Sequence, residues 1–147
     1  MQLTQFTDYA LRVLIYVALK EDATSTITEI SESYHISRNH LVKVVHKLGQ
    51  LGILNTTRGN QGGIRLSQKP GEINIGKLVQ QIEPHFFIVE CFDKKNGKCV
   101  ITPVCKLSTI LQQAKNRFIE TLNDYTLADV TQNSGELRKI LFTPPLA

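Results

Sequence analysis

The sequence predicts a mainly α-helical fold with one small β-hairpin. Two short amphipathic helices follow each other closely, over residues 28–34 and 38–50. The pattern then changes to two strand-like segments, 53–57 and 64–66, which a glycine-rich turn joins into a hairpin. An amphipathic stripe over 107–122 predicts a long helix. Together these features predict a winged helix-turn-helix followed by a long helix that is separate from it.

Composition sets the broad class. The chain has 147 residues, of which 41% are hydrophobic, which suits one domain with an appendage. Its formal net charge of +4 is compatible with nucleic acid, although that alone is weak support. No apolar run is long enough to cross a bilayer, and the first residues do not resemble a secretory signal. We therefore expect a cytoplasmic protein without membrane association.

Helix start and stop signals define the elements of the first half. A helix is expected from Phe6 to Lys20, with Thr4 or Thr7 as its cap. Thr26 or Thr28 caps the next helix, and Ser37 caps the helix over 38–50. Gly52 is the expected stop of that third helix. Its inward positions are Leu41, Val44, Val45 and Leu48.

Polar residues at the start of the helix over 38–50 are candidates for reading DNA. A recognition helix needs hydrogen-bonding side chains there, which Arg38 and Asn39 supply, while Lys43 could meet phosphate. The alternative is an ordinary solvated face. The adjoining hairpin favours DNA, because its glycine-rich loop lies between Arg58 and Arg65, and an arginine is favoured in a minor groove. The predicted DNA-binding set is Thr28, Ser37, Arg38, Asn39, His40, Lys43, Arg58, Gly59, Asn60, Gln61, Gly62, Gly63 and Arg65.

The second half is expected to contain a short helix over 75–82, a loop over 85–104 and the long helix. Thr126 to Asp129 fits the start of a short final helix. The apolar stripe of the long helix could be simple core packing, but its length and separation favour burial against a second copy. The stripe consists of Leu107, Ile110, Leu111, Ala114, Phe118 and Leu122. The chain thus divides into a DNA-binding domain (1–83), a cluster-binding loop (84–106) and a dimerisation segment (107–147).

Three cysteines, Cys91, Cys99 and Cys105, fall within fifteen residues. Clustered thiols in a reducing compartment indicate metal or redox chemistry more often than a disulfide framework. Zinc sites prefer four ligands and tighter pairs. The spacing leaves three interpretations open, namely an iron–sulfur cluster, a thiol redox switch or unrelated cysteines.

Several blocks together resemble a known family, the IscR-type winged-helix regulators, and within it the nitric-oxide-sensitive bacterial repressors. The resemblance covers nearly the whole chain. The matching blocks are MQLTQFTDYALR (1–12), SRNH with VK (37–43), RGNQGGIRL (58–66), the three cysteines and YTLAD (125–129). It implies a homodimer that represses genes for nitric oxide detoxification and is not an enzyme.

The resemblance also implies a 4Fe–4S cluster, with 2Fe–2S as the other possibility, which nitric oxide destroys. Three cysteines leave one iron to another ligand. The nearby candidates are His85, Glu90 and Asp93, whereas the resemblance points to Asp8, reaching the cluster of the partner subunit. The alternative is that Asp8 only favours the helix dipole. The gap between Cys91 and Cys99 is longer than is common in the family, which predicts a looser loop.

Three rival functions remain at this point. The nearest is an IscR-like regulator that reports cluster status rather than nitric oxide. A small electron carrier would use a cluster without any effect on DNA. A winged helix that recruits protein would lack a steep salt dependence of DNA affinity.

Overall fold

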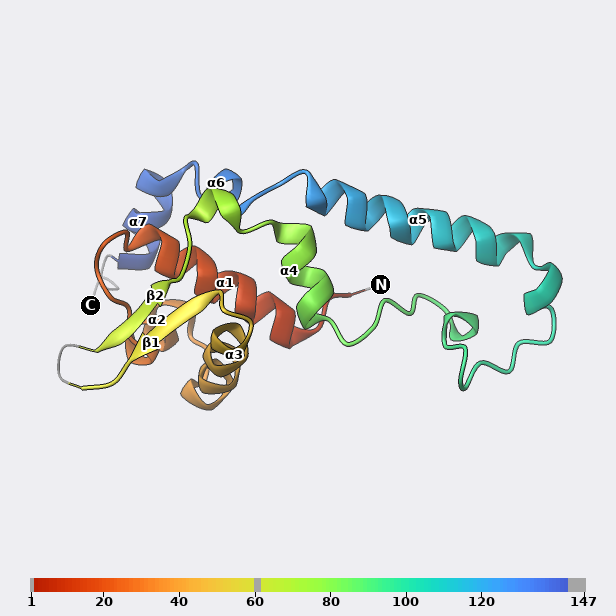
Figure 1. The fold of residues 1–147 in the computed structure, drawn as a ribbon, viewed down its shortest axis with the longest axis horizontal. Coiled ribbons are helices and arrows are strands. Elements are labelled where there is room, and N and C mark those ends of the chain that lie inside the picture. Colours follow the sequence, from red (N-terminus) through yellow and green to blue (C-terminus); the bar gives the residue numbers. More distant parts are fainter. Residues whose placement is uncertain (1, 60–61, 143–147) are drawn as a thin grey trace.

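The structure is a computed structural model that describes residues 2–59 and 62–142. The helices and strands run in the order α1 (Gln5–Leu19), α2 (Ile27–Tyr34), α3 (Arg38–Gln50), β1 (Leu54–Thr57), β2 (Gly63–Leu66), α4 (Ile75–Ile82), α5 (Lys106–Asn123), α6 (Leu127–Val130) and α7 (Ser134–Phe142). The predicted fold class, mainly helical with one hairpin, is confirmed (Figure 1).

Side-chain caps place the starts of the first three helices. Thr4 caps α1, accepting a hydrogen bond from the Thr7 backbone N–H at 3.3 Å. Thr26 caps α2 and forms a reciprocal capping box with Glu29. Ser37 occupies the N-cap position of α3, although its hydroxyl makes no capping hydrogen bond within the described chain. The structure thus selects Thr4 and Thr26 from the two caps predicted for each of these helices, and it confirms the position of Ser37 but not a capping hydrogen bond there.

The hairpin is tied to the rest of the domain. β1 and β2 pair antiparallel, with Asn55 opposite Arg65. Ser25 extends this sheet, since its backbone exchanges hydrogen bonds of 3.0 and 2.8 Å with Ile64. A Cβ added at Gly63 would lie 2.5 Å from Thr24 Cβ, so this position requires glycine. The root of the wing is therefore fixed to the loop between α1 and α2.

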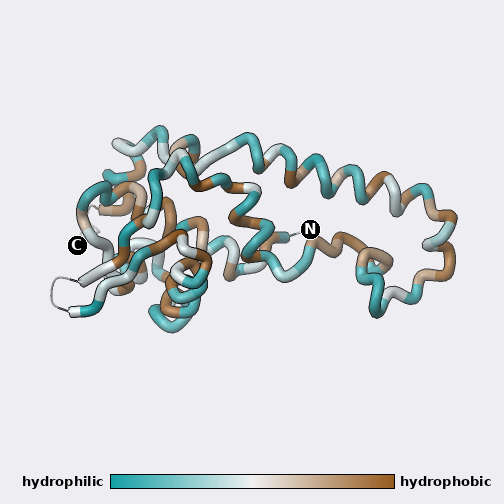
Figure 2. The backbone as a smooth tube through the Cα atoms, in the orientation of Figure 1, coloured by the Kyte–Doolittle hydropathy of each residue, from teal (hydrophilic) through white to brown (hydrophobic). Residues whose placement is uncertain are grey.

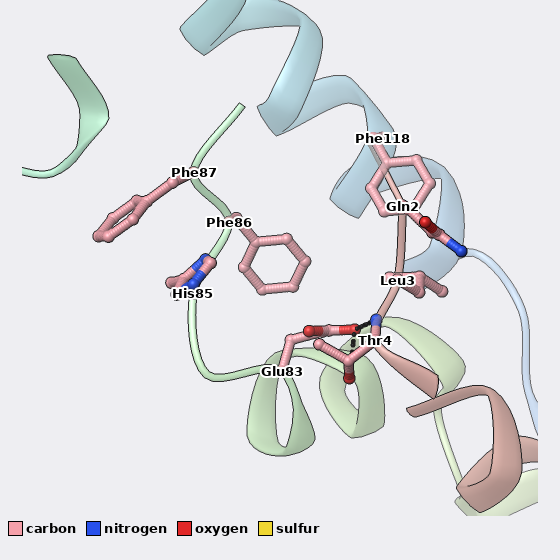
Figure 3. Close-up of a pocket in the computed structure, with 8 residues that line it drawn as sticks. All are labelled: Gln2, Leu3, Thr4, Glu83, His85, Phe86, Phe87 and Phe118. Carbon is pink, nitrogen blue, oxygen red and sulfur yellow. Dashed lines mark hydrogen bonds between the residues drawn. The ribbon is translucent and has the colours of Figure 1, made fainter. Parts of the chain in front are cut away.

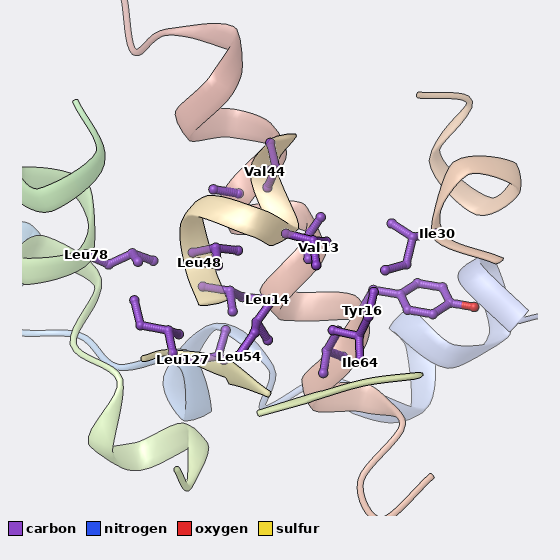
Figure 4. Packing of buried hydrophobic residues seen from close by; sticks show 14 of the residues in the cluster. Val13, Leu14, Tyr16, Ile30, Val44, Leu48, Leu54, Ile64, Leu78 and Leu127 are labelled. Carbon is purple, nitrogen blue, oxygen red and sulfur yellow. The ribbon is translucent and has the colours of Figure 1, made fainter. Parts of the chain in front are cut away.

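A hydrophobic core joins α1, α3 and α4 with the hairpin and the last two helices (Figure 4). α3 buries the four residues predicted to face inward. Leu127 of α6 is fully buried, and Ser33 of α2 donates a hydrogen bond to the Leu141 carbonyl of α7 at 2.9 Å. The short helix predicted to start at Thr126 forms as α6, but it is not the final helix, because α7 follows and both helices pack back on α1. We call α1–α4, the hairpin, α6 and α7 the head.

α5 projects from the head, and the cysteines lie in the segment near its outer end (Figure 1). Its inner end is held closely to α4, because the Asn74 amide donates to the Asn123 carbonyl at 2.6 Å. Gly76 allows this approach, since a Cβ there would lie 2.1 Å from the Asn123 side-chain oxygen. All residues of α5 are described, and none of them is buried. We call residues 84–123 the arm and residues 84–105 the cysteine segment.

Hydrophobic residues occur in both regions, and Figure 2 shows them in the head and along the cysteine segment. Within residues 2–59 and 62–142, no helix is long and apolar enough to cross a membrane.

Candidate functional site

The face of α3 opposite the core is polar and exposed. Ser37, Arg38, Asn39, His40 and Lys43 all lie on it with exposed side chains. Since the other face is held by the core, the helix can present these side chains to a groove without unfolding. This is the arrangement that a recognition helix needs.

The wing presents two exposed arginines, Arg58 and Arg65, at its tip and along β2. Gly59 has a positive φ of 107°, and its carbonyl accepts the Gly62 N–H at 2.9 Å. A Cβ at Gly62 would lie 2.3 Å from the Thr57 carbonyl oxygen. These two glycines thus turn the chain tightly beside Arg58. Asn60 and Gln61, also predicted to contact DNA, lie outside the described residues, and Thr28 is half-buried on α2.

The segment that contains α3 and the wing carries basic side chains and no acidic ones. Residues 33–71 contain no Asp or Glu and six Lys or Arg residues. These are Arg38, Lys43, Lys47, Arg58, Arg65 and Lys69. Such a surface attracts the phosphate backbone and does not repel it at any point.

The recognition helix contacts the start of α1. The Tyr9 ring lies 5.9 Å from the His40 ring, centroid to centroid. Tyr9 follows Asp8, so a residue next to a candidate cluster ligand touches a candidate DNA-contacting residue. Sequence reasoning missed this contact because it joins residues that are far apart in the chain.

Asp8 is engaged within its own helix. Its carboxylate pairs with Arg12, one turn later, through contacts of 3.1 Å to Nε and 2.8 Å to Nη2. Both side chains remain part-exposed. The other candidates for a fourth ligand also have local partners. His85 stacks on Phe87 at 4.5 Å, Glu90 accepts the Lys98 backbone N–H at 2.9 Å, and Asp93 closes a turn.

Two of the three cysteines converge on one residue of α5. The Cys91 thiol lies 3.8 Å from the Ser108 hydroxyl oxygen, and the Ser108 backbone N–H donates to Cys105 Sγ at 3.4 Å. Cys91 and Cys105 are half-buried, whereas Cys99 is exposed. Within the described ranges, no three His, Cys, Asp or Glu side chains are grouped closely enough to hold a metal ion.

The stretch between Cys91 and Cys99 forms a compact turn. The Asp93 carboxylate accepts the Lys95 and Asn96 backbone N–H groups at 3.0 and 3.2 Å and the Asn96 amide at 2.7 Å. These hydrogen bonds, chiefly that from the Asn96 side chain, lower the pKa of Asp93. Gly97 lies against this turn, and a Cβ at that position would lie 2.8 Å from the Asp93 carbonyl oxygen. The looser loop that the longer gap predicts is therefore not what forms.

A pocket of about 300 Å³ lies where the N-terminal segment, the end of α4 and α5 meet (Figure 3). Phe86, Phe87 and Phe118 form much of its wall. At its base the buried Glu83 carboxylate accepts the Thr4 backbone N–H at 2.6 Å and the Thr4 hydroxyl at 3.1 Å. Glu83 thereby joins the end of α4 to the start of α1. No local pattern in the sequence marks Glu83, because only a contact between residues far apart in the chain reveals its role.

Much of the predicted dimerisation stripe is exposed to solvent. Leu107 and Ile110 are 60% and 58% exposed, and Ala114 is exposed as well. Leu111, Phe118 and Leu122 are half-buried. The inner end of the stripe therefore packs within one chain, where Leu122 contacts the core and Phe118 lines the pocket, while the outer end at Leu107 and Ile110 is open.

These features define a DNA-binding transcription regulator, with a polar recognition helix and a basic wing carried on a packed head. Comparison with known proteins agrees. The model of the Rrf2 family, described as iron-dependent transcriptional regulators, matches residues 3–133. The chain belongs to the Rrf2 family of transcriptional regulators.

Relatives of this chain include the HTH-type transcriptional regulators NsrR of Bacillus subtilis and Halalkalibacterium halodurans. The first is 48% identical over 142 residues, covering 96% of this chain and 97% of the relative. The second is 44% identical over 146 residues, covering 99% and 100%. These relatives are regulators and not enzymes, as expected from the sequence, and the predicted resemblance is confirmed.

Solved structures support the fold. Bacillus subtilis CymR, the global cysteine regulator, is 19% identical, with a TM-score of 0.73 over 90% of this chain and 98% of that one. The IscR of T. potens is 19% identical, with a TM-score of 0.74 over 94% and 91%.

Proposed function

We propose that this regulator is a cytoplasmic homodimeric repressor that senses nitric oxide through an iron–sulfur cluster held by Cys91, Cys99 and Cys105. The observation that carries the sensor role is the convergence of Cys91 and Cys105 on Ser108. Thiols from two ends of a loop contact the same residue at the start of a helix that has no buried residue. Similarity to the NsrR regulators and the iron dependence of the family support the same proposal.

The donor set fits an iron–sulfur cluster in its chemistry. Thiolates are the ligands such clusters take, and three are available in one segment. The exposed Cys99 follows the turn at Asp93 and is the donor that has to close on the other two. When bound, a cluster supplies thiolate-held iron, which is the atom that nitric oxide attacks. We favour the 4Fe–4S type from the resemblance, with 2Fe–2S as the alternative.

Asp8 of the partner subunit is the proposed fourth ligand. To reach a cluster it has to leave Arg12, and because this ion pair is part-exposed its loss costs about 0.2–1 kcal/mol. A carboxylate is a harder and weaker ligand for iron than thiolate, so the iron that it holds would be the most labile of the site. Release of Asp8 then frees it to return to Arg12.

Dimerisation is assigned to the open stripe of α5. Because the arm projects from the head, pairing two arms would fix the distance between two heads, and hence between two recognition helices (Figure 1). The contact between Tyr9 and His40 offers a route from Asp8 to the DNA-binding face. Loss of the ligand would then shift the population of dimers competent to bind DNA and derepress the target genes.

The test uses Cys91→Ala, Cys99→Ala and Cys105→Ala in protein purified without oxygen. Each variant is expected to lose the broad visible band of the cluster and to lose repression while it stays folded and soluble. Iron content, absorption and operator binding before and after stoichiometric nitric oxide are the measurements. A variant that keeps its full iron and full repression would remove that cysteine from the ligand set.

Asp8→Asn serves as the matched variant, since it keeps the size of the side chain and removes only its charge and the ion pair with Arg12. Changed nitric oxide kinetics and weaker repression would support ligation. Wild-type behaviour would leave Asp8 with a structural role only. Wild-type protein that binds a cluster but keeps its operator after nitric oxide would instead favour a regulator of cluster status.

A further inference from the structure

Ser108 contacts two candidate ligands in two different ways. Its backbone N–H donates to Cys105 Sγ at 3.4 Å, and its side-chain oxygen lies 3.8 Å from Cys91 Sγ. It is half-buried, in the first turn of α5. A single residue therefore holds two thiols that are separated by most of the cysteine segment.

Ordinary helix capping explains only one of these contacts. Cys105 is the N-cap of α5 and accepts the N–H of the third helical residue, as capping side chains do. Capping does not require a hydroxyl at Ser108, nor does it bring Cys91 to that hydroxyl from across the loop. The first turn of α5 also contains no acidic side chain that would repel a thiolate.

We propose that Ser108 is a positioning residue for the iron–sulfur site, an inference that rests on the proposed function. As a thiol, Cys91 donates to the Ser108 oxygen. As a thiolate ligand it can only accept, so the direction of the hydrogen bond reverses and the Ser108 hydroxyl donates to it. Ser108 then supplies one donor to each of two ligand sulfurs, through its hydroxyl and its backbone.

This has a consequence for the retention of iron. Hydrogen bonds to ligand sulfurs tune a cluster, and loss of an outer hydrogen-bonding partner typically weakens metal affinity about 10–100-fold. Ser108→Ala removes the donor to Cys91 and keeps the backbone donor to Cys105. We therefore expect iron to pass to a chelator about tenfold faster from Ser108→Ala than from the wild type.

The placement of Ser108 can be tested without any cluster. A protein with Cys99→Ser, Cys105→Ser and Ser108→Cys retains Cys91 and a new thiol beside it. Diamide takes two electrons and two protons from two neighbouring thiols, which form a disulfide while diamide becomes the hydrazine. Thr109→Cys in the same background is the matched control, because Thr109 is exposed and adjacent in sequence. Mass spectrometry should find the intramolecular disulfide with residue 108 and little with residue 109.

The second readout is the rate of iron transfer to a chelator from full-length reconstituted protein, comparing Ser108→Ala with Thr109→Ala. A preferred disulfide at 108 together with faster iron loss only in Ser108→Ala supports the proposal. Equal cross-linking at both positions, or unchanged iron loss, overturns it. If the disulfide forms but wild-type protein binds no iron, both the proposed function and the positioning role fail, while the contact between Ser108 and Cys91 stands.

Discussion

The head and the arm use hydrophobic residues in opposite ways. The head contains the hydrophobic core, with Leu14, Leu48 and Leu127 at essentially full burial, and leaves only a few large apolar side chains of its described residues exposed, Ile140 among them. The arm leaves them in solvent, with Val100 and Val104 of the cysteine segment 90% and 82% exposed. An exposed apolar stretch of this kind usually marks an interaction site. The head therefore has a closed hydrophobic core within one chain, whereas the arm exposes the apolar side chains that we propose pair with a second copy.

Truncation of one leucine in each region tests whether apolar side chains stabilise the head but not the arm. Leu14→Ala opens a cavity in the closed core and should lower the free energy of unfolding by about 3 kcal/mol. Leu107→Ala removes an exposed side chain and should change the unfolding of the monomer by less than about 0.5 kcal/mol. Urea unfolding at low protein concentration measures both.

Leu107→Ala should instead act on self-association, weakening it about tenfold if the stripe pairs with a second copy. Analytical ultracentrifugation gives the dissociation constant. An unchanged dimer in Leu107→Ala would show that the stripe is not the interface, and a large loss of monomer stability would show that the arm is part of the core.

What could be predicted from the sequence depended on whether the signal was local or joined distant residues. The bounds of α3 and α4 are those predicted, because local signals stop both helices, Gly52 after α3 and Pro84 after α4. The start of α7 at Ser134 was missed, because the expected signal at Thr126 begins only the short α6. The Asp8–Arg12 pair was readable from its spacing of one helical turn. The contacts of Ser108 and Glu83 were not, because they join residues that no local pattern relates.

The predicted DNA-binding face of α3 gives a further test, because its side chains are exposed while the other face of the helix is held in the core. Arg38→Ala should cost about 1–3 kcal/mol in binding to the operator and little on random DNA, as expected for a residue that reads bases. Lys43→Ala should weaken both and lower the slope of log affinity against log salt by about 1. Fluorescence anisotropy over a salt series separates the two effects.

Lys94→Ala is the matched control for these variants. It removes the same charge from an exposed residue in the cysteine segment and should leave the salt slope unchanged. Equal losses for Arg38→Ala on operator and random DNA would reduce its role to phosphate contact. A fall in slope for Lys94→Ala would place the cysteine segment at the DNA as well.

The smallest expected effect concerns Glu83, which lies at the end of α4, directly before the arm begins, and joins α4 to the start of α1. Its carboxylate accepts both the backbone N–H and the hydroxyl of Thr4, at the start of the helix that carries Asp8. Both donors bond the same oxygen, Oε1, so Glu83→Gln keeps the shape and an acceptor but removes the charge, and hydrogen bonds to a charged acceptor contribute more than neutral ones. We expect it to lower the free energy of unfolding by about 1 kcal/mol in urea titrations.

Glu72→Gln is the control. Glu72 is exposed, and its side chain bonds to nearby Lys69, so the substitution should lower the free energy of unfolding by less than about 0.5 kcal/mol.

The coupling of Glu83 to Thr4 is isolated by a double-mutant cycle with Thr4→Ala, in which the two single losses of unfolding free energy should not add. If Glu83 also holds α1 in place for the sensor, Glu83→Gln should alter the nitric oxide kinetics of the cluster-loaded protein while Glu72→Gln does not. Full additivity in the cycle would show that the end of α4 and the start of α1 meet at this point without being coupled through it.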